Sequence, residues 1–399
     1  MKKLLLGAAL SLVLALPAQA ADIKVGSAAA VTGPIADLAK DIVAGRNLAA
    51  SQINKQGGLL KGDMLKLVLA DSGCDPKVAV DAGNKLINVE QVVAIVGPSC
   101  SGATNALVQS VSIPAGVVAV SDSASAPTIS HLKDNDLVFR TAASDAYQGL
   151  KLAQLTIAHK IKKVALSYAN DDYNAALAGV FEKEYKKMGG KVVAVQAHEP
   201  KKASYRSEVA TLAKGGANTL VLFAYYGSSG ITIIRNSLET GAFNFFIGAD
   251  GMVSQELIKQ IGAKNLKGHG FFTTSAPDNT TAAYKNYETA AKAAKVKAAG
   301  PFVANGYDAV YLVALAIEKA GSADRSKISA ALHEVSNAPG TVILPGQWAK
   351  AKKLIDAGKP VHYMGASGPV NFDKNGDVAG SFSLNTVQAN GTWKTALLH

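Results

Sequence analysis

The chain has 399 residues, of which 48 % are hydrophobic and only 6 % aromatic, and it contains 37 glycines. This composition fits a helix-and-sheet protein with many tight turns better than a β-sandwich, and no segment is of low complexity. The formal net charge is +11, but the lysines are scattered along the sequence rather than gathered with aromatic residues, so we do not expect a partner that is a nucleic acid.

The first 20 residues have the three parts of an export signal. A charged start, Lys2-Lys3, precedes an apolar run over residues 4–17 and the small-residue motif Ala18-Gln19-Ala20, which predicts a signal peptide at residues 1–20 with cleavage after Ala20. The apolar run is too short for a bilayer span, although a membrane anchor is the alternative interpretation. The mature protein is therefore expected to be soluble and exported, with 379 residues, a formal charge of +9 and length enough for two domains.

Short apolar runs alternate with longer amphipathic ones from residue 21 onward, which is typical of parallel α/β sheets. A first series has predicted strands at residues 23–30, 65–70, 92–96 and 117–120, and predicted helices at 35–53, 78–87 and 104–111. For the helix at 78–87, Asp75 is a candidate N-cap and Pro76 occupies the first helical position.

The pattern restarts near residue 144. Predicted strands follow at 164–167, 191–195, 219–223, 243–247 and 270–274, with predicted helices at 148–158, 175–188, 205–214, 232–240 and 255–261. After these come helices at 282–295, 305–320, 324–335 and 348–357, a glycine-rich stretch at 365–380 and a last strand at 381–387. Helices without intervening strands indicate that the chain returns to cover the first half of the molecule.

The predicted fold class is therefore α/β, with two lobes that each contain a mostly parallel sheet flanked by helices. Lobe one is expected at residues 21–143 and 275–364, and lobe two at 144–274 and 365–399. Because the lobes are discontinuous in sequence, the chain crosses between them several times, and a three-strand hinge is expected there.

Hydroxyl and aromatic side chains follow several predicted strands at their carboxyl ends, where open α/β sheets bind ligands. The most informative stretch is the turn from Gly97 to Gly102, which places Ser99 and Ser101 between a strand and a helix and offers backbone N–H groups to an anion. Comparable positions occur at residues 121–127, 168–173, 225–229 and 247–251. Together they predict a ligand cleft.

No enzyme is predicted, since the sequence has no G-x-S-x-G, H-E-x-x-H, G-K-[ST] or G-x-G-x-x-G motif. The turn at 97–102 has its second glycine one place too far for a nucleophile elbow. The seven histidines are isolated, and residues 373–377 lack the spacing of a calcium loop, so neither a metal nor another cofactor is expected. An exported hydrolase is the alternative that these absences disfavour.

Cys74 and Cys100 are the two cysteines of the chain. In an exported protein they predict a single disulfide, which would stabilise the fold by roughly 3–4 kcal/mol through loop closure.

The order and spacing of several short motifs over residues 21–399 give a family resemblance. They are Ile23-Lys24-Val25, Thr32-Gly33-Pro34, Ile53-Asn54, Gly57-Gly58, Cys74-Asp75-Pro76, Gly365-Ala366-Ser367-Gly368-Pro369-Val370, Phe372-Asp373 and Gly376-Asp377. The chain resembles the periplasmic substrate-binding proteins of ABC transporters for branched-chain amino acids, the leucine/isoleucine/valine-binding family with the type I periplasmic binding fold.

This resemblance implies binding roles for four residues of the first lobe and a disulfide for two others. The hydroxyl and backbone N–H of Ser101 would hold a ligand carboxylate. Ser123, Ala124 and Ser125 would offer a backbone carbonyl to the ammonium group and an N–H or hydroxyl to the ligand's charged end. The family's disulfide corresponds to Cys74 and Cys100.

The resemblance also implies roles in the second lobe. Tyr173 and Tyr226 would close over the ligand, and Asp250 would pair with its ammonium group. Two departures leave the ligand open: Asp250 stands where a glutamate is common, and Leu38 stands where a tyrosine is familiar.

The implied function is capture of an amino acid, branched-chain or otherwise aliphatic, in the periplasm and its delivery to the transmembrane subunits of an ABC permease. A monomer is expected, with no covalent chemistry. A ligand-sensing module and a binder of a related amide or aromatic acid are the alternatives.

Overall fold

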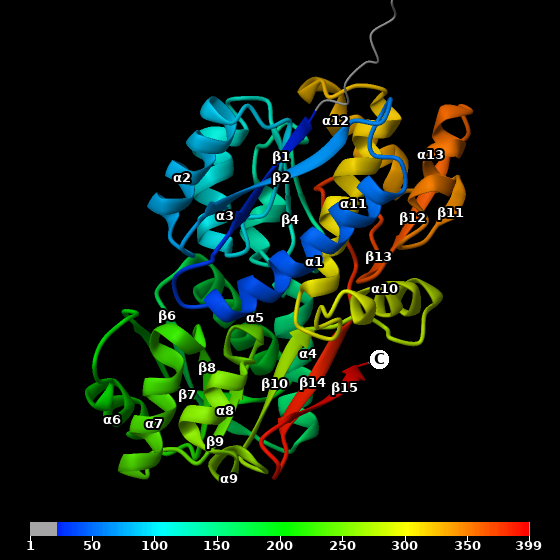
Figure 1. The fold of residues 1–399 in the computed structure, drawn as a ribbon. Coiled ribbons are helices and arrows are strands. Elements are labelled where there is room, and N and C mark those ends of the chain that lie inside the picture. Colours follow the sequence, from blue (N-terminus) through cyan, green and yellow to red (C-terminus); the bar gives the residue numbers. More distant parts are fainter. Residues whose placement is uncertain (1–21, 399) are drawn as a thin grey trace, which may run out of the picture.

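Two sheets made mainly of parallel strands form the two halves of the molecule, as the computed structural model in Figure 1 shows. It describes residues 22–398. The predicted signal peptide and its cleavage site lie outside the described residues. The predicted α/β fold with two lobes is confirmed.

Lobe one contains a five-stranded parallel sheet in the order β2-β1-β3-β4-β5. Its strands are β1 Asp22–Ala29, β2 Met64–Asp71, β3 Ala94–Val96, β4 Val118–Ser121 and β5 Val138–Arg140. Its helices are α1 Ala36–Lys55, α2 Pro76–Asn84 and α3 Ser101–Leu107, with π-helical turns at Lys85–Val89 and Val108–Ser112 and a 3₁₀ turn at Pro127–His131.

Lobe two contains a seven-stranded sheet in the order β15-β14-β10-β9-β8-β6-β7, in which β14 and β15 run antiparallel to their neighbours. Its strands are β6 Lys163–Ala169, β7 Lys191–His198, β8 Thr219–Phe223, β9 Phe245–Gly248, β10 Gly270–Ser275, β14 Phe382–Val387 and β15 Trp393–Leu398. Its helices are α4 Asp145–Ala158, α5 Asp172–Lys187, α6 Arg206–Ala213, α7 Ile231–Thr240, α8 Gln255–Ile261 and α9 Ala263–Leu266, with short helical turns at Tyr226–Gly230 and Asp250–Met252.

The helices that follow β10 return to lobe one, as expected. They are α10 Ala282–Ala293, α11 Val303–Ala320, α12 Arg325–Ser336 and α13 Trp348–Asp356, together with a small sheet of β11 Thr341–Ile343, β12 Val361–Gly365 and β13 Gly368–Pro369. Helix α11 is buried along almost its whole length and packs against α1. The two helices approach closely because Gly45 lacks a side chain, since a Cβ there would lie 2.4 Å from the carbonyl oxygen of Val303.

Helix α2 begins as the sequence predicts. The side chain of Asp75 accepts hydrogen bonds from the backbone N–H groups of Lys77 (2.9 Å) and Val78 (3.1 Å), and Pro76 is the first helical residue. These contacts satisfy donors that a helix start otherwise leaves unpaired.

Three segments carry the chain between the two sheets: one between β5 and α4, one after β10, and one before β14. They lie side by side, since the N–H of Ala276 donates to the carbonyl of Ser381 (3.0 Å) and the N–H of Arg140 donates to that of Gly376 (3.0 Å).

The stretch at 365–380 differs from the expected lobe division. Val370, Phe372 and Val378 pack in the core of lobe one, and Asp377 forms an ion pair with Arg140 at 2.6 Å. Because burial and pairing both tie this stretch to lobe one, we propose that the last segment of lobe two begins near residue 381 rather than at 365.

Several short strands were absent from the sequence prediction. Strands β5 and β11 have three residues each, and β13 has two, too few to give a period-2 pattern. β12 alternates over five residues but is short and leads directly into the glycine-rich stretch, and β15 is an edge strand in which no side chain is fully buried, so it lacks a hydrophobic face.

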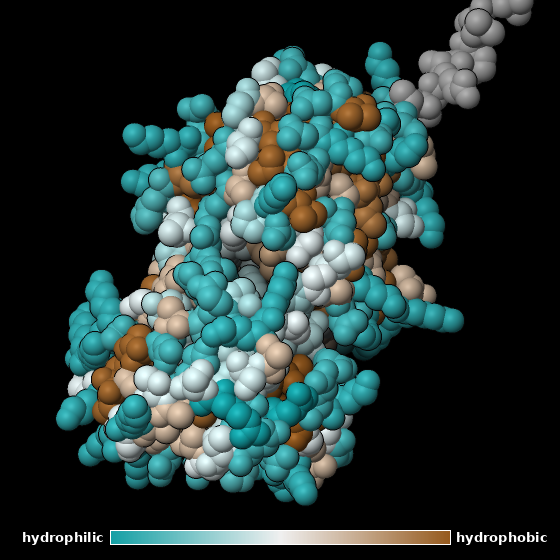
Figure 2. Space-filling model, turned by 90° about the vertical axis from the view of Figure 1, so that its left-hand side faces the viewer, coloured by the Kyte–Doolittle hydropathy of each residue, from teal (hydrophilic) through white to brown (hydrophobic). Residues whose placement is uncertain are grey.

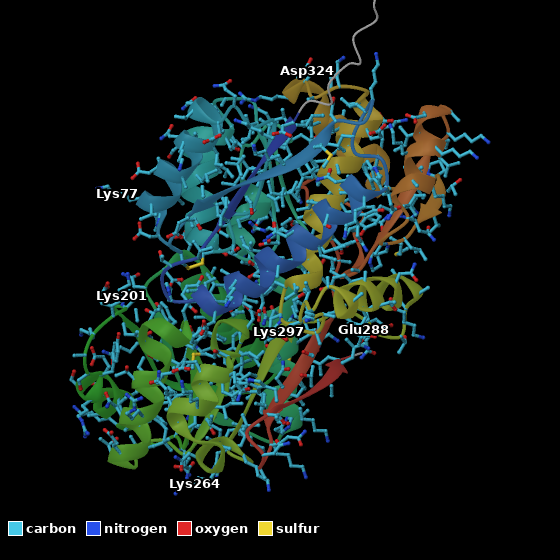
Figure 3. All side chains as sticks on the ribbon, viewed as in Figure 1. Lys77, Lys201, Lys264, Glu288, Lys297 and Asp324 are labelled. Carbon is cyan, nitrogen blue, oxygen red and sulfur yellow. A yellow bond between two sulfur atoms is a disulfide. The ribbon has the colours of Figure 1, made fainter. Side chains whose placement is uncertain are left out.

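The surface carries dispersed charge. Lys77, Lys201, Lys264 and Lys297 project from different elements of the molecule in Figure 3, and the face in Figure 2 is largely hydrophilic with small apolar areas over both lobes. Within residues 22–398, the helices are all too short or too polar to cross a membrane.

Candidate functional site

A narrow cleft with a cavity volume of about 20 Å³ lies between the lobes. Its walls come from the start of α1, the turn before α3, the loop after β4, the start of α5, the ends of β8 and β9, and the residue before α11. The lining residues are Ile35, Leu38, Ser99, Cys100, Ser101, Ser123, Tyr173, Tyr225, Asp250, Gly251 and Phe302.

Ser101 presents a hydrogen-bond donor to the cleft. Its Oγ accepts hydrogen bonds from the backbone N–H groups of Ser125 (3.2 Å) and Ala126 (3.1 Å). These bonds occupy the two lone pairs of the hydroxyl oxygen, so its proton is available to an acceptor in the cleft.

Ala124 and Ser125 do not line the cleft, in contrast to Ser123. Both are buried behind it. The backbone N–H of Ser125 donates to the hydroxyl of Ser101, and the hydroxyl of Ser125 donates to the carboxylate of Asp145 (3.0 Å). Of the three residues predicted from the sequence in this loop, Ser123 lines the cleft, whereas Ala124 and Ser125 lie behind the lining.

Asp250 places a carboxylate in the cleft wall, where it is only 6 % exposed. Its oxygens accept hydrogen bonds from the hydroxyl of Tyr173 (2.9 Å) and from the amide of Gln148. Both donors are neutral. Burial raises the pKa of Asp250 above its usual value, and these hydrogen bonds offset part of that effect.

A second buried acid, Asp145, stands near Asp250. Burial raises the pKa of Asp145 well above its usual value, and the charge of Asp250 raises it further. Neither Asp145 nor Gln148 is among the site residues predicted from the sequence. Both lie on α4, and only the folding of α4 against β10 and β9 reveals their relation to Asp250.

Two stacked aromatic rings cover one side of the cleft. The rings of Tyr173 and Tyr225 lie 5.4 Å apart between centroids, with an angle of 25° between their planes. The prediction of Tyr226 differs from this geometry: Tyr226 is buried beside Asp37 and Leu38 in a neighbouring hollow and does not line the cleft. The adjacent tyrosines follow the same strand, and the sequence does not indicate which one turns toward the ligand.

Ile35, Leu38 and Phe302 supply an apolar wall. Leu38 and Phe302 pack together with Ile42 and Ala142. Phe302 has a backbone φ of 60°, a left-handed conformation that is uncommon for a bulky residue and often marks a functional site. The sequence around Phe302 does not indicate that it lines the cleft, because the ring reaches the cleft only through the return of α11 to lobe one.

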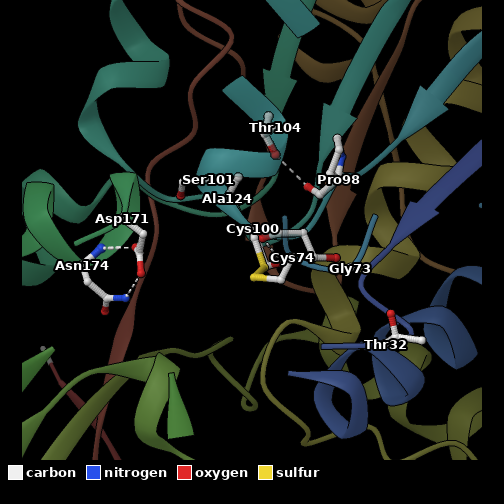
Figure 4. The surroundings of a disulfide bond; sticks show 12 residues. Thr32, Gly73, Cys74, Pro98, Cys100, Ser101, Thr104, Ala124, Asp171 and Asn174 are labelled. Atoms are coloured by element: carbon white, nitrogen blue, oxygen red, sulfur yellow. Dashed lines mark hydrogen bonds between the residues drawn. A yellow bond between two sulfur atoms is a disulfide. The ribbon is translucent and has the colours of Figure 1, made fainter. Parts of the chain in front are cut away.

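The predicted disulfide between Cys74 and Cys100 is confirmed, with a Cα–Cα distance of 5.3 Å. Figure 4 shows it directly beside Ser101, between the loops that precede α2 and α3. The bond therefore connects the turn that carries Ser101 to the loop after β2. Within residues 22–398, no cluster of three or more histidine, cysteine, aspartate or glutamate side chains has the arrangement of a metal site.

Comparisons with known proteins agree with this geometry. A family model described as periplasmic binding protein matches residues 22–387. A leucine-, isoleucine-, valine-, threonine- and alanine-binding protein of Pseudomonas aeruginosa is 31 % identical over 318 residues, which cover 78 % of this chain and 82 % of the relative.

Two solved structures share the fold. A leucine-binding protein from Thermotoga maritima has a TM-score of 0.79 at 23 % identity, covering 94 % of this chain and 99 % of that one. A solute-binding protein of an ABC transporter from R. palustris, solved in complex with 4-hydroxybenzoate, has a TM-score of 0.76 at 18 % identity, covering 95 % and 96 %. The match over nearly the whole described chain establishes that this chain belongs to the periplasmic binding protein family, among the relatives of the branched-chain amino-acid-binding proteins.

Proposed function

We propose that this chain is the substrate-binding protein of an ABC importer and that it captures an aliphatic, branched-chain amino acid in the cleft between its lobes. The observation that carries the proposal is the combination, in one small cleft, of the donor hydroxyl of Ser101, the buried carboxylate of Asp250 and an apolar wall. The Pseudomonas aeruginosa relative, which binds leucine, isoleucine, valine, threonine and alanine, points to the same class of ligand.

An amino-acid zwitterion matches the charges of this cleft. Its carboxylate needs donors, which Ser101 offers, and its ammonium group needs an acceptor with negative charge, which Asp250 offers. A buried carboxylate without a cation is costly, because neutral donors replace only part of its hydration. A bound ammonium group would therefore be favoured over a neutral group at Asp250.

The apolar wall suits the ligand's side chain. Ile35, Leu38 and Phe302 present no hydrogen-bonding groups from their side chains, so they would favour an aliphatic chain over a polar one. The stacked rings of Tyr173 and Tyr225 would exclude water from the charged end once the lobes close.

An aromatic acid is the second candidate, because one protein of the same fold was solved with 4-hydroxybenzoate. Such a ligand has a carboxylate for Ser101 but no cation for Asp250. The buried acid thus favours the amino acid.

The wider role follows from the family. We propose export to the periplasm after cleavage at Ala20, action as a monomer, and delivery of the ligand to the transmembrane subunits of an ABC permease. The protein would bind its ligand without chemical conversion and without a cofactor.

Isothermal titration calorimetry with protein freed of bound ligand by unfolding and refolding tests this function. The panel is leucine, isoleucine, valine, 4-hydroxybenzoate, and 3-methylbutylamine, which is leucine without its carboxylate. We expect tight binding of at least one of the amino acids and much weaker binding of the other two compounds. Binding of 4-hydroxybenzoate in the absence of amino-acid binding would overturn the proposal.

A further inference from the structure

A buried ion pair lies directly behind two serines of the cleft. Arg46, on α1, and Asp122, after β4, are both fully buried, and the nearest oxygen of Asp122 lies 2.6 Å from Nη2 and 2.7 Å from Nε of Arg46. The guanidinium also donates to the hydroxyl of Ser27 (2.9 Å) and the carbonyl of Ala28 (3.0 Å) at the end of β1. The pair thus connects α1 with the ends of two strands that carry the cleft.

The other oxygen of Asp122 faces the cleft serines. Its Oδ1 lies 3.2 Å from the hydroxyl of Ser99 and 3.2 Å from the hydroxyl of Ser123. The Ser123 hydroxyl also lies 2.9 Å from the carbonyl oxygen of Ser99. All of these oxygen partners are acceptors, since a carboxylate paired with a guanidinium has no proton to donate.

The hydroxyl protons of Ser99 and Ser123 therefore point away from the cleft. Ser99 Oγ additionally accepts from Arg46 Nη2 at 3.4 Å, which leaves it one lone pair, whereas Ser123 Oγ keeps both. Ser101 is the opposite case, because two backbone N–H groups occupy its lone pairs and free its proton. The cleft thus presents acceptor hydroxyls at Ser99 and Ser123 and a donor hydroxyl at Ser101.

We infer that the Arg46–Asp122 pair is a positioning device that fixes Ser99 and Ser123 as hydrogen-bond acceptors and so makes the cleft selective for a ligand with an ammonium group. The inference rests on the proposed function, namely the binding of an amino acid, and identifies what beyond Asp250 selects for the ammonium. A ligand with a hydroxyl in place of the ammonium has one proton to donate rather than three, so it would leave some of these acceptors unpaired.

The test compares an amino acid with the 2-hydroxy acid of the same carbon skeleton. Leucine, isoleucine and valine and their 2-hydroxy analogues are titrated into wild-type protein and variants, by calorimetry or by competition where binding is weak. Ser123→Ala and Asp122→Asn are expected to lower the affinity for the amino acid by roughly 10- to 100-fold, the range for a hydrogen bond to a charged group, and to lower the affinity for the hydroxy acid much less. Ser101→Ala should weaken both ligands alike.

Asp122→Asn leaves Arg46 without its charged partner, and this variant can fail to fold. Ser123→Ala removes no buried charge, so its effect on the ratio of the two affinities is the decisive test of the inference. Asp308→Asn is the control for the loss of a buried carboxylate in lobe one. Asp308 is fully buried and accepts hydrogen bonds from Tyr363, Ala366 and Ser367, away from the cleft. This variant should lower the melting temperature without changing the ratio of the two affinities.

Two negative results have different meanings. If wild-type protein binds none of the three amino acids, the proposed function fails and the inference fails with it. If wild-type protein binds an amino acid but Ser123→Ala leaves the ratio of the two affinities unchanged, the inference alone is overturned.

Discussion

At the scale of single residues, Asp250 illustrates how a binding site differs from a stable core. Its carboxylate is buried, and the groups that donate to it, Tyr173 and Gln148, are neutral. A core optimised for stability alone would pair such a charge or replace it with an apolar residue. The missing cation is what a ligand with an ammonium group would supply.

The raised pKa of Asp250 predicts how ligand affinity depends on pH. In the proposed site a ligand's ammonium group would bind the ionised carboxylate, and burial raises the pKa of Asp250, which keeps its proton bound to a higher pH than on an ordinary aspartate. Affinity for the amino acid should therefore be highest near neutral pH and begin to fall on acidification before an ordinary aspartate would be protonated. Calorimetry between pH 7.5 and 4.5 measures this slope.

Asp250→Asn is the control for the dependence of ligand affinity on pH. The asparagine side chain cannot ionise. The affinity of this variant for the amino acid should be weaker than that of the wild type, and it should vary much less over the same pH range. If the affinity of Asp250→Asn changed with pH as steeply as that of the wild type, the pH dependence would belong to another group, such as Asp145.

The two neighbouring tyrosines allow a matched test of the cleft geometry. Tyr225→Ala removes a ring that lines the cleft and stacks on Tyr173, so ligand affinity should fall by about 10- to 100-fold, as expected for about 1.5–3 kcal/mol of apolar burial and stacking. Tyr226→Ala removes a ring of the same kind outside the cleft and should reduce thermal stability more than affinity. A larger loss of affinity in Tyr226→Ala would instead support the family-based assignment of Tyr226.

At the scale of elements, several local contacts fix the conformation of the turn between β3 and α3, which carries Ser101. Gly97 adopts a φ of 95°, and a Cβ there would lie 2.0 Å from the carbonyl oxygen of Ala28, so only glycine fits. The hydroxyl of Thr104 donates to the carbonyl of Pro98 (3.0 Å), and Cys100 connects the turn to the loop that holds Cys74. These constraints fix the position of Ser101 before a ligand arrives.

Removal of the disulfide should therefore affect both stability and binding. For a sequence separation of 26 residues, the chain-entropy model predicts that Cys74→Ala/Cys100→Ala lowers the free energy of unfolding by about 3–4 kcal/mol. Urea unfolding measures this change, with reduced wild-type protein as a second sample. Ligand affinity should fall as well, because the turn with Ser101 loses its connection to the loop after β2. An unchanged urea midpoint would contradict the prediction.

At the scale of the whole molecule, a direct contact joins the lobes beside the cleft. Asn105, on α3, donates a hydrogen bond from Nδ2 to the carboxylate of Asp172 at 2.8 Å. Asp172 is the first residue of α5 and precedes Tyr173, which covers the cleft. Because this hydrogen bond joins the two lobes, their separation would break it, and we expect it to stabilise the arrangement seen in this structure.

Asn105→Ala should shift the protein toward an open arrangement. Loss of one hydrogen bond of about 0.5–1.5 kcal/mol predicts a ligand dissociation rate about 2- to 10-fold higher and a larger radius of gyration without ligand. Stopped-flow displacement and small-angle scattering measure the two quantities. Gln109→Ala is the matched control, because Gln109 is exposed and its side-chain amide donates to the carbonyl of Asn105 within lobe one. If both variants behave like the wild type, the contact does not contribute to closure.

Much of this architecture follows from local sequence. The alternation of apolar runs and amphipathic segments predicted the two sheets, and Asp75 with Pro76 predicted the start of α2. Two cysteines in a chain with an export signal predicted the disulfide, and residues at the carboxyl ends of strands predicted the cleft. The sheets, the start of α2 and the position of the cleft depend on periodicity, capping and strand direction, which a short stretch of sequence already determines.

Other features became visible only in the tertiary structure. Phe302 enters the cleft because α11 returns to lobe one, Tyr225 rather than Tyr226 turns inward, and residues 365–380 pack with lobe one. Arg46 meets Asp122 across 76 residues of sequence. Each depends on how distant elements pack against one another, which local patterns do not encode. The sequence by itself thus determined the fold class and the strand ends that form the cleft, whereas packing between distant segments decided which side chains line it.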